Sequence, residues 1–239
     1  MTTYARKIEK LVLHSDSLGE SRCVRISFPP DYDNRNRYPV LIGQDGEELF
    51  NYGRIVTQAN TMMAEQDVKP FLIVGIDSIP SLRREDYHPD GKRFIPYCRF
   101  IADELLPYLE RSYPLSTHVY DLVLMGDSLG GTVSLHLALD RPSLFQQVVS
   151  FSGAFYFQTH QRITEETDLS DLRLYQTVGL GEDAFETPSG VYNFVDLNRT
   201  ARRLLDERGA KVVYMETEGR HVWGAWQPLI PAALRYFFG

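Results

Sequence analysis

Three small residues, Gly126, Ser128 and Gly130, stand at alternate positions in one short stretch of the chain. This spacing is the nucleophile-elbow pattern, in which a buried strand turns sharply into a helix and presents a serine on the bend. The glycines are needed because side chains there would collide with the neighbouring strand and helix. The flanks agree, since residues 119–125 are apolar like a buried strand and residues 129–139 repeat apolar residues at helical spacing. The sequence therefore predicts Ser128 as a nucleophile rather than part of a chance turn.

A serine hydroxyl attacks at neutral pH only when a neighbouring base removes its proton and a third group orients that base. On a strand-turn-helix scaffold of this kind the order along the chain is serine, acid, histidine, each after the end of a strand. Of the six histidines, three precede Ser128, His136 falls within the predicted elbow helix, and His160 follows no strand end. His221 lies just past the last predicted strand. We predict His221 as the base.

The acid should follow the strand that ends at Gly179, where Glu182 and Asp183 are adjacent. Two neighbouring carboxylates cannot both face the histidine, so the other carboxylate would be a solvated side chain of the loop. We favour Glu182 and keep Asp183 as the alternative, with Glu186 and Asp196 as more remote candidates.

The oxyanion of an acyl-transfer intermediate needs backbone donors. The first is the N–H of Leu129, the residue after the nucleophile. The second is expected from the loop after the strand at 40–42, at Gly46 or Glu47, where a glycine lets the backbone approach a substrate carbonyl. The alternative for this loop is a plain tight turn formed by Asp45 and Gly46.

Residues 77–94 are polar and follow a predicted strand, which places them at the ligand-facing edge of a parallel sheet. We expect substrate contact from Arg84 and Tyr87 of this loop and from Trp223, close to the predicted base. The alternative for the loop is a solvated connection with a few ion pairs. The polar stretch at 154–171 is a candidate lid.

The elements that must position these groups follow from apolar patterning. Strand and helix alternate from Val40 onward, after two β-rich runs joined by turn residues. We predict one domain, 1–239, with an α/β-hydrolase fold: a doubly wound, mostly parallel sheet with an antiparallel N-terminal hairpin and helices on both faces. The expected strands are 8–14, 22–28, 38–43, 70–76, 119–125, 147–153, 172–179 and 211–216, and the expected helices are 53–65, 97–108, 129–139, 193–207 and 224–238.

Composition excludes several other classes of protein. A formal net charge of −7 without a basic run argues against binding to nucleic acid. The first ten residues lack the apolar core of a signal peptide, and no apolar run reaches the roughly 18 residues of a membrane-spanning helix. We therefore expect a cytoplasmic protein that binds no membrane. The two cysteines, Cys23 and Cys98, are far apart in sequence and are interpreted as packing thiols.

Together these pieces resemble an esterase family of α/β-hydrolases that includes enterochelin esterases, esterase D (S-formylglutathione hydrolase) and feruloyl and acetylxylan esterases. The resemblance implies Ser128 as nucleophile, His221 as base and Glu182 or Asp183 as acid, acting through an acyl-enzyme without metal or cofactor. The sequence departs from the family at residues 184–192, which look like an insertion, and at Gly219-Arg220, where relatives often have two glycines. The matching pieces are residues 38–41, 44–46, 100–108, 126–131, 178–179, 198–199 and 219–226.

The sequence thus predicts a serine esterase acting on a small-molecule ester, with a siderophore-type trilactone as one candidate substrate. Acyl transfer or thioester hydrolysis on the same residues is the alternative reaction, and a hydrolase-like binding protein without turnover is the alternative from another class. The sequence leaves the oligomeric state open.

Overall fold

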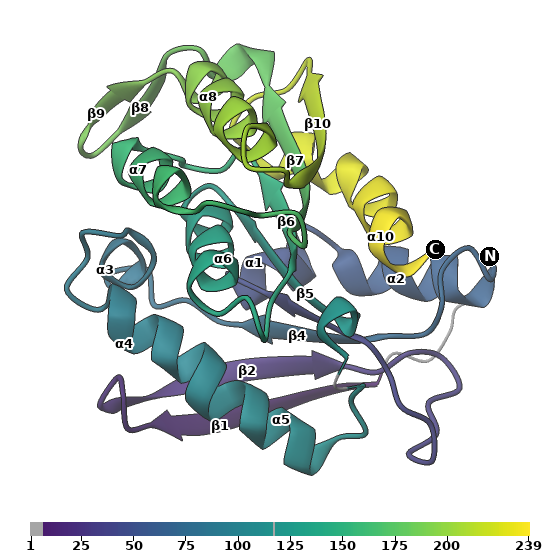
Figure 1. Cartoon of the computed structure of the whole chain (residues 1–239). Coiled ribbons are helices and arrows are strands. Elements are labelled where there is room, and N and C mark those ends of the chain that lie inside the picture. The colour runs from purple at the N-terminus through teal and green to yellow at the C-terminus, as the bar shows by residue number, and fades with distance from the viewer. Residues whose placement is uncertain (1–6, 117) are drawn as a thin grey trace.

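The computed structural model describes residues 7–116 and 118–239. Residues 1–6, part of the segment that we expect to lack a signal peptide, lie outside this described part. The main sheet has eight strands in the order β1-β2-β4-β3-β5-β6-β7-β10, and Figure 1 shows their arrangement. The strands are β1 (Ile8–Ser15), β2 (Glu20–Ser27), β3 (Val40–Gly43), β4 (Leu72–Ile76), β5 (Leu122–Asp127), β6 (Gln147–Phe151), β7 (Arg173–Gly179) and β10 (Lys211–Thr217).

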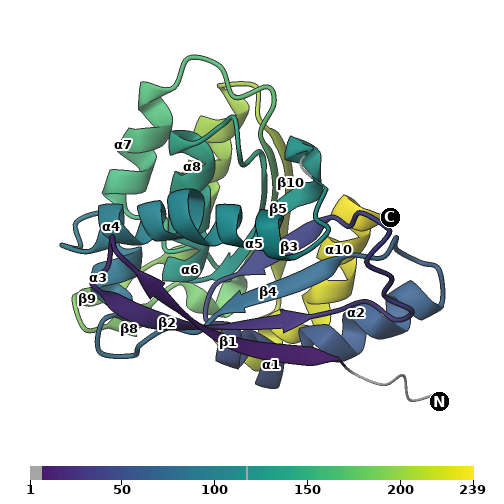
Figure 2. The same ribbon diagram turned by 90° about the horizontal axis from the view of Figure 1, so that it is seen from below.

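The antiparallel part of the sheet lies at the N-terminal edge. The turn between β1 and β2 closes with a hydrogen bond from the Gly19 N–H to the Ser15 carbonyl, and Gly19 has φ +67°, which a glycine adopts without strain. β2 also pairs antiparallel with β4, whereas the pairs from β4 through β10 are parallel. Figure 2 shows the β1–β2 pair along the edge of the sheet. The predicted fold class is confirmed.

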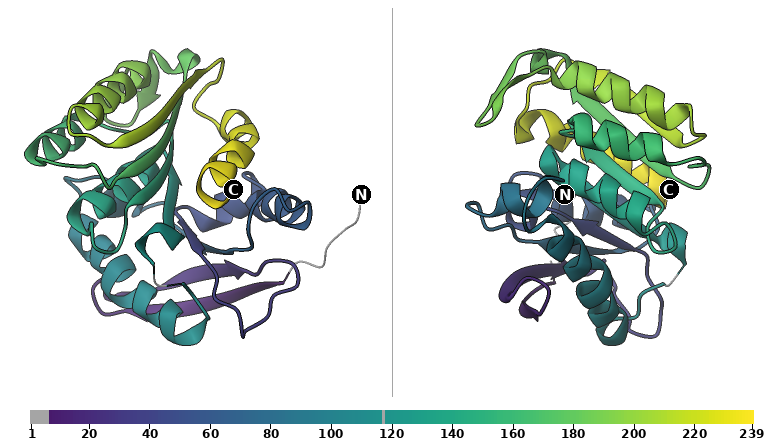
Figure 3. Two further views of the ribbon diagram at one scale, coloured as in Figure 1. Left: turned by 45° about the vertical axis from the view of Figure 1, so that its right-hand side comes forward. Right: turned by 60° about the vertical axis from the view of Figure 1, so that its left-hand side comes forward.

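Helices cover both faces of the sheet. The left view of Figure 3 shows α10 (yellow) and α2 (blue) on one side and the teal and green helices on the other. The first face carries α1 (Gly46–Asn51), α2 (Ile55–Ala64), α9 (Trp223–Trp226) and α10 (Ile230–Phe238). The second carries α4 (Phe94–Arg99), a π-helical segment (Phe100–Leu105), α5 (Leu106–Ser112), α6 (Leu129–Asp140), α7 (Phe157–Glu165) and α8 (Phe194–Asp206).

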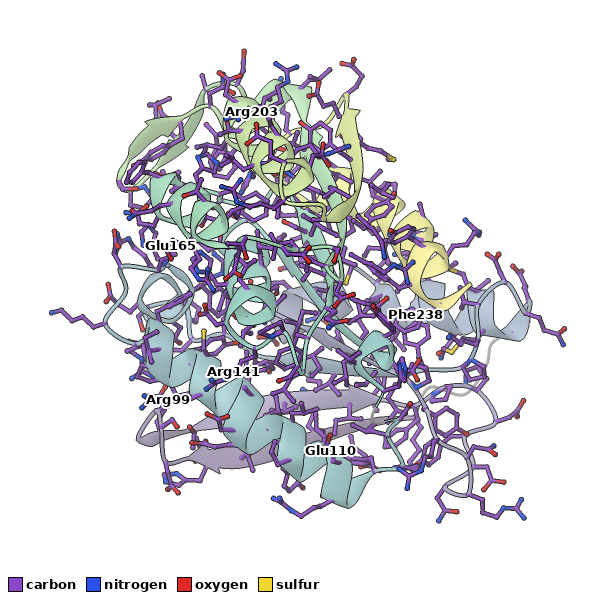
Figure 4. The ribbon with its side chains drawn as sticks, in the orientation of Figure 1. Arg99, Glu110, Arg141, Glu165, Arg203 and Phe238 are labelled. Carbon is purple, nitrogen blue, oxygen red and sulfur yellow. The ribbon has the colours of Figure 1, made fainter. Side chains whose placement is uncertain are left out.

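Buried side chains alternate between the two faces along each central strand, as the period of a β-strand requires. Leu41 and Val123 pack in one core with α2 and α10, and Ile42 and Leu124 pack in the other with α5 and α6. Phe238 of α10 stacks on Phe71 with 4.0 Å between ring centroids. Figure 4 labels Phe238 together with five exposed charged residues of the second face: Arg99, Glu110, Arg141, Glu165 and Arg203.

Some elements differ from those expected. Residues 46–51 form α1 rather than a loop, residues 83–87 form α3 (Arg83–Tyr87), and residues 184–192 contain a small antiparallel pair, β8 (Phe185–Thr187) and β9 (Gly190–Tyr192). Within residues 7–116 and 118–239, no helix has both the length and the apolar character to cross a membrane.

The register of the parallel strands decides where the loops meet. Asp127 at the end of β5 pairs with Phe151 at the end of β6, and Phe151 pairs with Thr177 of β7. Gly179 at the end of β7 pairs with Thr217 at the end of β10. The segments that follow these strands therefore leave the sheet at one edge, and they include Ser128, Glu182 and His221.

Candidate active site

Ser128 stands on the bend between β5 and α6. Its backbone has φ +53° and ψ −123°, a conformation that non-glycine residues rarely adopt. The bend is held because the Ser128 N–H donates to the Phe151 carbonyl (2.9 Å) and the Ser128 carbonyl accepts the Ala154 N–H (3.0 Å). There is no room for a larger residue at Gly126, where a Cβ would lie 2.3 Å from the carbonyl carbon of Gly130. The half-buried Ser128 side chain consequently sits on a strand-turn-helix bend of the kind that the spacing predicts.

Glu182 ends a 3₁₀ turn, Leu180–Glu182, that directly follows β7. Its side chain is 1% exposed, whereas Asp183 is exposed. Glu182 Oε1 accepts the Gly179 N–H at 2.8 Å, and Oε2 lies 2.6 Å from His221 Nδ1. The turn therefore directs Glu182, and not Asp183, toward the histidine.

His221 lies in the loop between β10 and α9. Three aromatic rings surround its imidazole, with centroid distances of 4.2 Å to Phe185, 4.6 Å to Phe194 and 4.9 Å to Trp226. These rings and the Glu182 carboxylate limit the orientations open to the imidazole, whose Nδ1 faces Glu182 Oε2.

Ser128 and His221 line the same pocket, which has a volume of about 650 Å³. Its walls come from α3, the β8–β9 pair, the start of α6 and the loop before α9, and Figure 1 shows α3 and the β8–β9 pair on the same side of the molecule. The other lining residues are Glu48, Pro80, Arg83, Arg84, His88, Asp127, Leu129, Tyr156, Phe185, Glu186, Thr187, Pro188, Ser189, Val222, Trp223 and Trp226.

The predicted oxyanion donors lie on two helix starts. Leu129 is the first residue of α6 and lines the pocket, and backbone N–H groups in a first helical turn lack partners within the helix. Gly46 and Glu47 begin α1, and a Cβ on Gly46 would lie 2.5 Å from the carbonyl carbon of Gly75. In this segment Glu48 lines the pocket, so the second donor, Gly46 or Glu47, stays a prediction.

The predicted substrate-contacting residues separate into two groups. Arg84 and Trp223 line the pocket, and the Trp223 Nε1–H donates to Glu48 Oε2 at 2.9 Å. Tyr87 does not line it, because its side chain is fully buried and its hydroxyl accepts the Asp45 N–H at 3.3 Å. We therefore correct the expectation for Tyr87: it supports the loop before α1 from inside.

A buried pair of carboxylates, Asp45 and Asp127, shares the guanidinium of Arg83, and Asp127 is next to Ser128 in the sequence. Asp45 binds Arg83 through two hydrogen bonds of 2.8 Å, and Asp127 Oδ2 lies 3.9 Å from Arg83 Nη2. Burial, and next the charge of Asp45, raise the pKa of Asp127 to about 7, while Arg83 acts in the opposite direction. The described residues contain no cluster of three or more His, Cys, Asp or Glu side chains that could hold a metal ion.

A comparison with protein families shows which family the chain belongs to. A family model described as "Putative esterase" matches residues 15–237. The chain belongs to this esterase family. Membership implies the chemistry of a carboxylic ester hydrolase.

Among curated relatives of this chain, "Uncharacterized protein YjcH" of Bacillus subtilis (strain 168) is 32% identical over 230 residues, covering 95% of this chain and 96% of the relative. Among solved structures, a ferulic acid esterase superposes with a TM-score of 0.84 at 16% identity, over 99% of both chains. The enterobactin esterase FES from Shigella flexneri superposes with a TM-score of 0.82 at 20% identity, over 96% of this chain and 59% of that chain. At these identities the two superpositions establish the fold.

Several residues around the pocket are not named in the sequence prediction. Phe185 could have been found from Pro188-Ser189-Gly190, a turn sequence between short β-rich runs, which is a hairpin signal. His88 and Tyr156 lie in the two polar stretches, 77–94 and 154–171, that the sequence places near the ligand, but nothing in the sequence singles out either residue within its stretch. Ser152, whose hydroxyl donates to Glu182 Oε1 at 2.6 Å, follows a strand but belongs to no motif.

Proposed function

We propose that this chain is a serine carboxylesterase in which Ser128 is the nucleophile, His221 the base and Glu182 the acid. The contact between His221 Nδ1 and Glu182 Oε2, at 2.6 Å, carries the proposal. It leaves Nε2 as the ring nitrogen available to the hydroxyl of Ser128, which lines the same pocket. A carboxylate in this position holds the imidazole in the tautomer that accepts the serine proton and stabilises the imidazolium that forms.

The reaction then proceeds in two halves. Ser128 Oγ attacks the ester carbonyl carbon while His221 Nε2 takes the hydroxyl proton, and the backbone N–H of Leu129 stabilises the oxyanion. His221 returns the proton to the departing alkoxide, which leaves as the alcohol, and Ser128 carries the acyl group. Water attacks this acyl-enzyme with His221 again acting as base, so the products are an acid and regenerated Ser128.

The pocket supports a small ester with an aromatic component. Tyr156, Phe185 and Trp223 supply aromatic lining, and Arg84 and Glu48 supply charge of opposite sign. The similar solved structures are named as a ferulic acid esterase and an enterobactin esterase. We therefore propose that the substrate is an ester whose acyl part carries an aromatic group, with a siderophore-type trilactone as one candidate. Comparing kcat/KM for short acyl esters, feruloyl esters and catecholate trilactones distinguishes these candidates.

The first test is Ser128→Ala. The fold should survive, because alanine occupies less space than serine, while the hydrolysis of p-nitrophenyl acetate falls by about 10³-fold or more. Ser134→Ala is the matched control, since Ser134 is a buried serine of α6, the helix that follows Ser128, and lies outside the pocket. A fluorophosphonate should add to Ser128 in the wild type and in the control. Turnover near wild type in Ser128→Ala would refute the assignment.

A second pair of variants tests the acid. Glu182→Gln should lower kcat by about 10³–10⁴-fold, because an amide cannot hold the imidazole in the required tautomer. Asp183→Asn should stay close to wild type, since its exposed side chain lies outside the pocket. A mild loss in Glu182→Gln together with a severe loss in Asp183→Asn would move the acid to Asp183.

A further inference from the structure

A chain of three buried groups ends on the Glu182 carboxylate. The indole N–H of Trp226 donates to Ser152 Oγ at 2.8 Å, and the Ser152 hydroxyl donates to Glu182 Oε1 at 2.6 Å. Ser152 is fully buried and Trp226 is 5% exposed. The direction is fixed because an indole N–H can only donate, so the Ser152 hydroxyl accepts from Trp226 and directs its own proton to Glu182.

The two oxygens of the carboxylate have different partners. Oε1 accepts from the Ser152 hydroxyl and from the Gly179 N–H, whereas Oε2 contacts His221 Nδ1. Two donors on one oxygen hold the carboxylate in a single rotamer and leave the other oxygen for the imidazole. Trp226 touches both ends of this arrangement, since its ring also packs edge-on against His221.

Contacts with the neighbouring strands hold the backbone at Ser152 in a strained conformation, and this fixes the position of its hydroxyl. Ser152 has φ +48°, in the left-handed region that disfavours residues with a Cβ. It follows Phe151, whose neighbours in the sheet are Asp127 of β5 and Thr177 of β7. The Ser152 N–H donates to the Thr177 carbonyl at 2.7 Å. Ser152 is thus fixed between the strand that carries the nucleophile and the strand that carries the acid.

We propose that Ser152 and Trp226 are positioning residues, which act through Glu182 to hold His221 in its reactive orientation. This inference rests on the function proposed above. Neither residue exchanges a proton with substrate. Their effect falls on the turnover of bound substrate rather than on binding.

Removing the Ser152 hydroxyl has two physical consequences. The carboxylate keeps only the Gly179 donor on Oε1, so it samples other rotamers and the contact with His221 loosens. Its negative charge also becomes less dispersed, which stabilises the imidazolium more strongly than before. We expect kcat to fall about tenfold with KM unchanged, as for the loss of one hydrogen bond to a charged group, and the acidic limb of the kcat/KM profile to move to higher pH.

The aromatic rings packed on His221 are those of Phe185, Phe194 and Trp226, which carry no charge. Other charged or titratable side chains share the pocket with it and must be considered in any pH profile. They are Glu48 of α1, Arg83 and Arg84 of α3, His88 after α3, Asp127 of β5, Tyr156 before α7 and Glu186 of β8.

The experiment compares three variants with a matched control. Ser152→Ala and Ser152→Gly both remove the hydroxyl, and glycine also relieves the positive φ, so a loss shared by both does not come from backbone strain. Trp226→Phe keeps a ring against His221 but removes the N–H. The control is Ser150→Ala, because Ser150 is a fully buried serine of β6, two residues before Ser152, and its hydroxyl has no hydrogen-bond partner among the described residues.

The proposal predicts a loss of kcat and a displaced acidic limb in the three variants, with KM unchanged in the two Ser152 variants, since Ser152 lies outside the pocket that Trp226 lines. Ser150→Ala should be unchanged. The low-field proton resonance of the His221 Nδ1–H should also shift in Ser152→Ala and Ser152→Gly. Wild-type kcat in both Ser152 variants overturns the proposal. Reduced activity with an unmoved pH profile and resonance also overturns it, since that is the signature of a structural role. Full activity in Ser128→Ala would instead remove the proposed function itself.

Discussion

Asp127 immediately precedes the proposed nucleophile and is the most unusual charge in the site. Its side chain is 7% exposed, and its Oδ1 has no hydrogen-bond partner among the described residues. Arg83 is already committed to Asp45 through two hydrogen bonds, so it compensates Asp127 only from 3.9 Å. Burial of an incompletely paired carboxylate disfavours its charged form, which explains why the pKa of Asp127 rises to about 7.

This pKa makes stability depend on pH. The folded chain retains the Asp127 proton up to about pH 7, whereas the unfolded chain releases it near pH 4. Between these values the folded state binds more protons, so the contribution of Asp127 to stability declines as pH rises and is lost above about pH 7. Asp127→Asn removes the titration. We expect the Tm of Asp127→Asn minus the Tm of wild type to be larger at about pH 8 than at about pH 5. The change in this difference should be about 2–4 °C for each kcal/mol of stability that wild type loses over that interval.

The control for this measurement is Asp183→Asn, because Asp183 is exposed. Thermal unfolding followed by circular dichroism at both pH values gives the comparison. A difference between Asp127→Asn and wild type that stays constant with pH would show that Asp127 is charged throughout.

Single residues differ in how far the sequence could predict them. Ser128 and His221 follow from spacing and chain order, because a strand end is visible before each of them. Glu182 and Asp183 are adjacent, and only the 3₁₀ turn after β7 shows which of them faces inward. Ser152 could not be found, since a serine after a buried strand is common and its positive φ leaves no mark on the sequence.

At the scale of elements, the part of the chain that covers the pocket is not the one expected. The stretch at 154–171 forms α7, whose His160 contacts the Leu197 carbonyl of α8 at 2.9 Å, and within this stretch Tyr156 lines the pocket. Residues 185–189, by contrast, all line it. Polar composition suggested a lid at 154–171, but packing of α7 on α6 and α8 makes it part of the helical layer.

The β8–β9 pair should therefore set selectivity rather than support chemistry. Replacing residues 186–191 by a short Gly-Ser link, with Phe185 retained against His221, should leave p-nitrophenyl acetate hydrolysis within about threefold. It should reduce discrimination between bulky and small esters by about tenfold or more, as the loss of pocket contacts does. The measurement is kcat/KM over a series of acyl sizes.

Val191→Ser is the control for that replacement. Val191 belongs to β9 but is 61% exposed and does not line the pocket, so its change should leave the series untouched. Unaltered selectivity after replacement of the whole hairpin would show that the pocket discriminates elsewhere.

At the scale of the whole molecule, the alternation of strand and helix sufficed to predict the sheet and its two covering layers. The reason is that a parallel strand must be covered on both faces, which produces continuous apolar runs such as residues 70–76. The β8–β9 pair was missed because each strand has only three residues, too few to show an apolar period, so the turn between them is the one signal that the sequence offers. The order of elements along the chain predicts which strand ends are followed by candidate site residues. The contacts between the loops after those strands could be seen only in the structure.

Cooperative unfolding would test the prediction that the chain forms one domain. The C-terminal helix packs against the segment just before β4, where the Lys69 N–H donates to the Phe238 carbonyl at 2.9 Å and Phe71 stacks on Phe238. A continuous eight-stranded sheet connects both halves. Unfolding in urea should therefore give coincident transitions by far-ultraviolet circular dichroism, by fluorescence of Trp223 and Trp226, and by loss of esterase activity. Tryptophan fluorescence that changes at a lower urea concentration than the circular dichroism would mean that the C-terminal segment unfolds as a separate unit, since both tryptophans of the chain lie there.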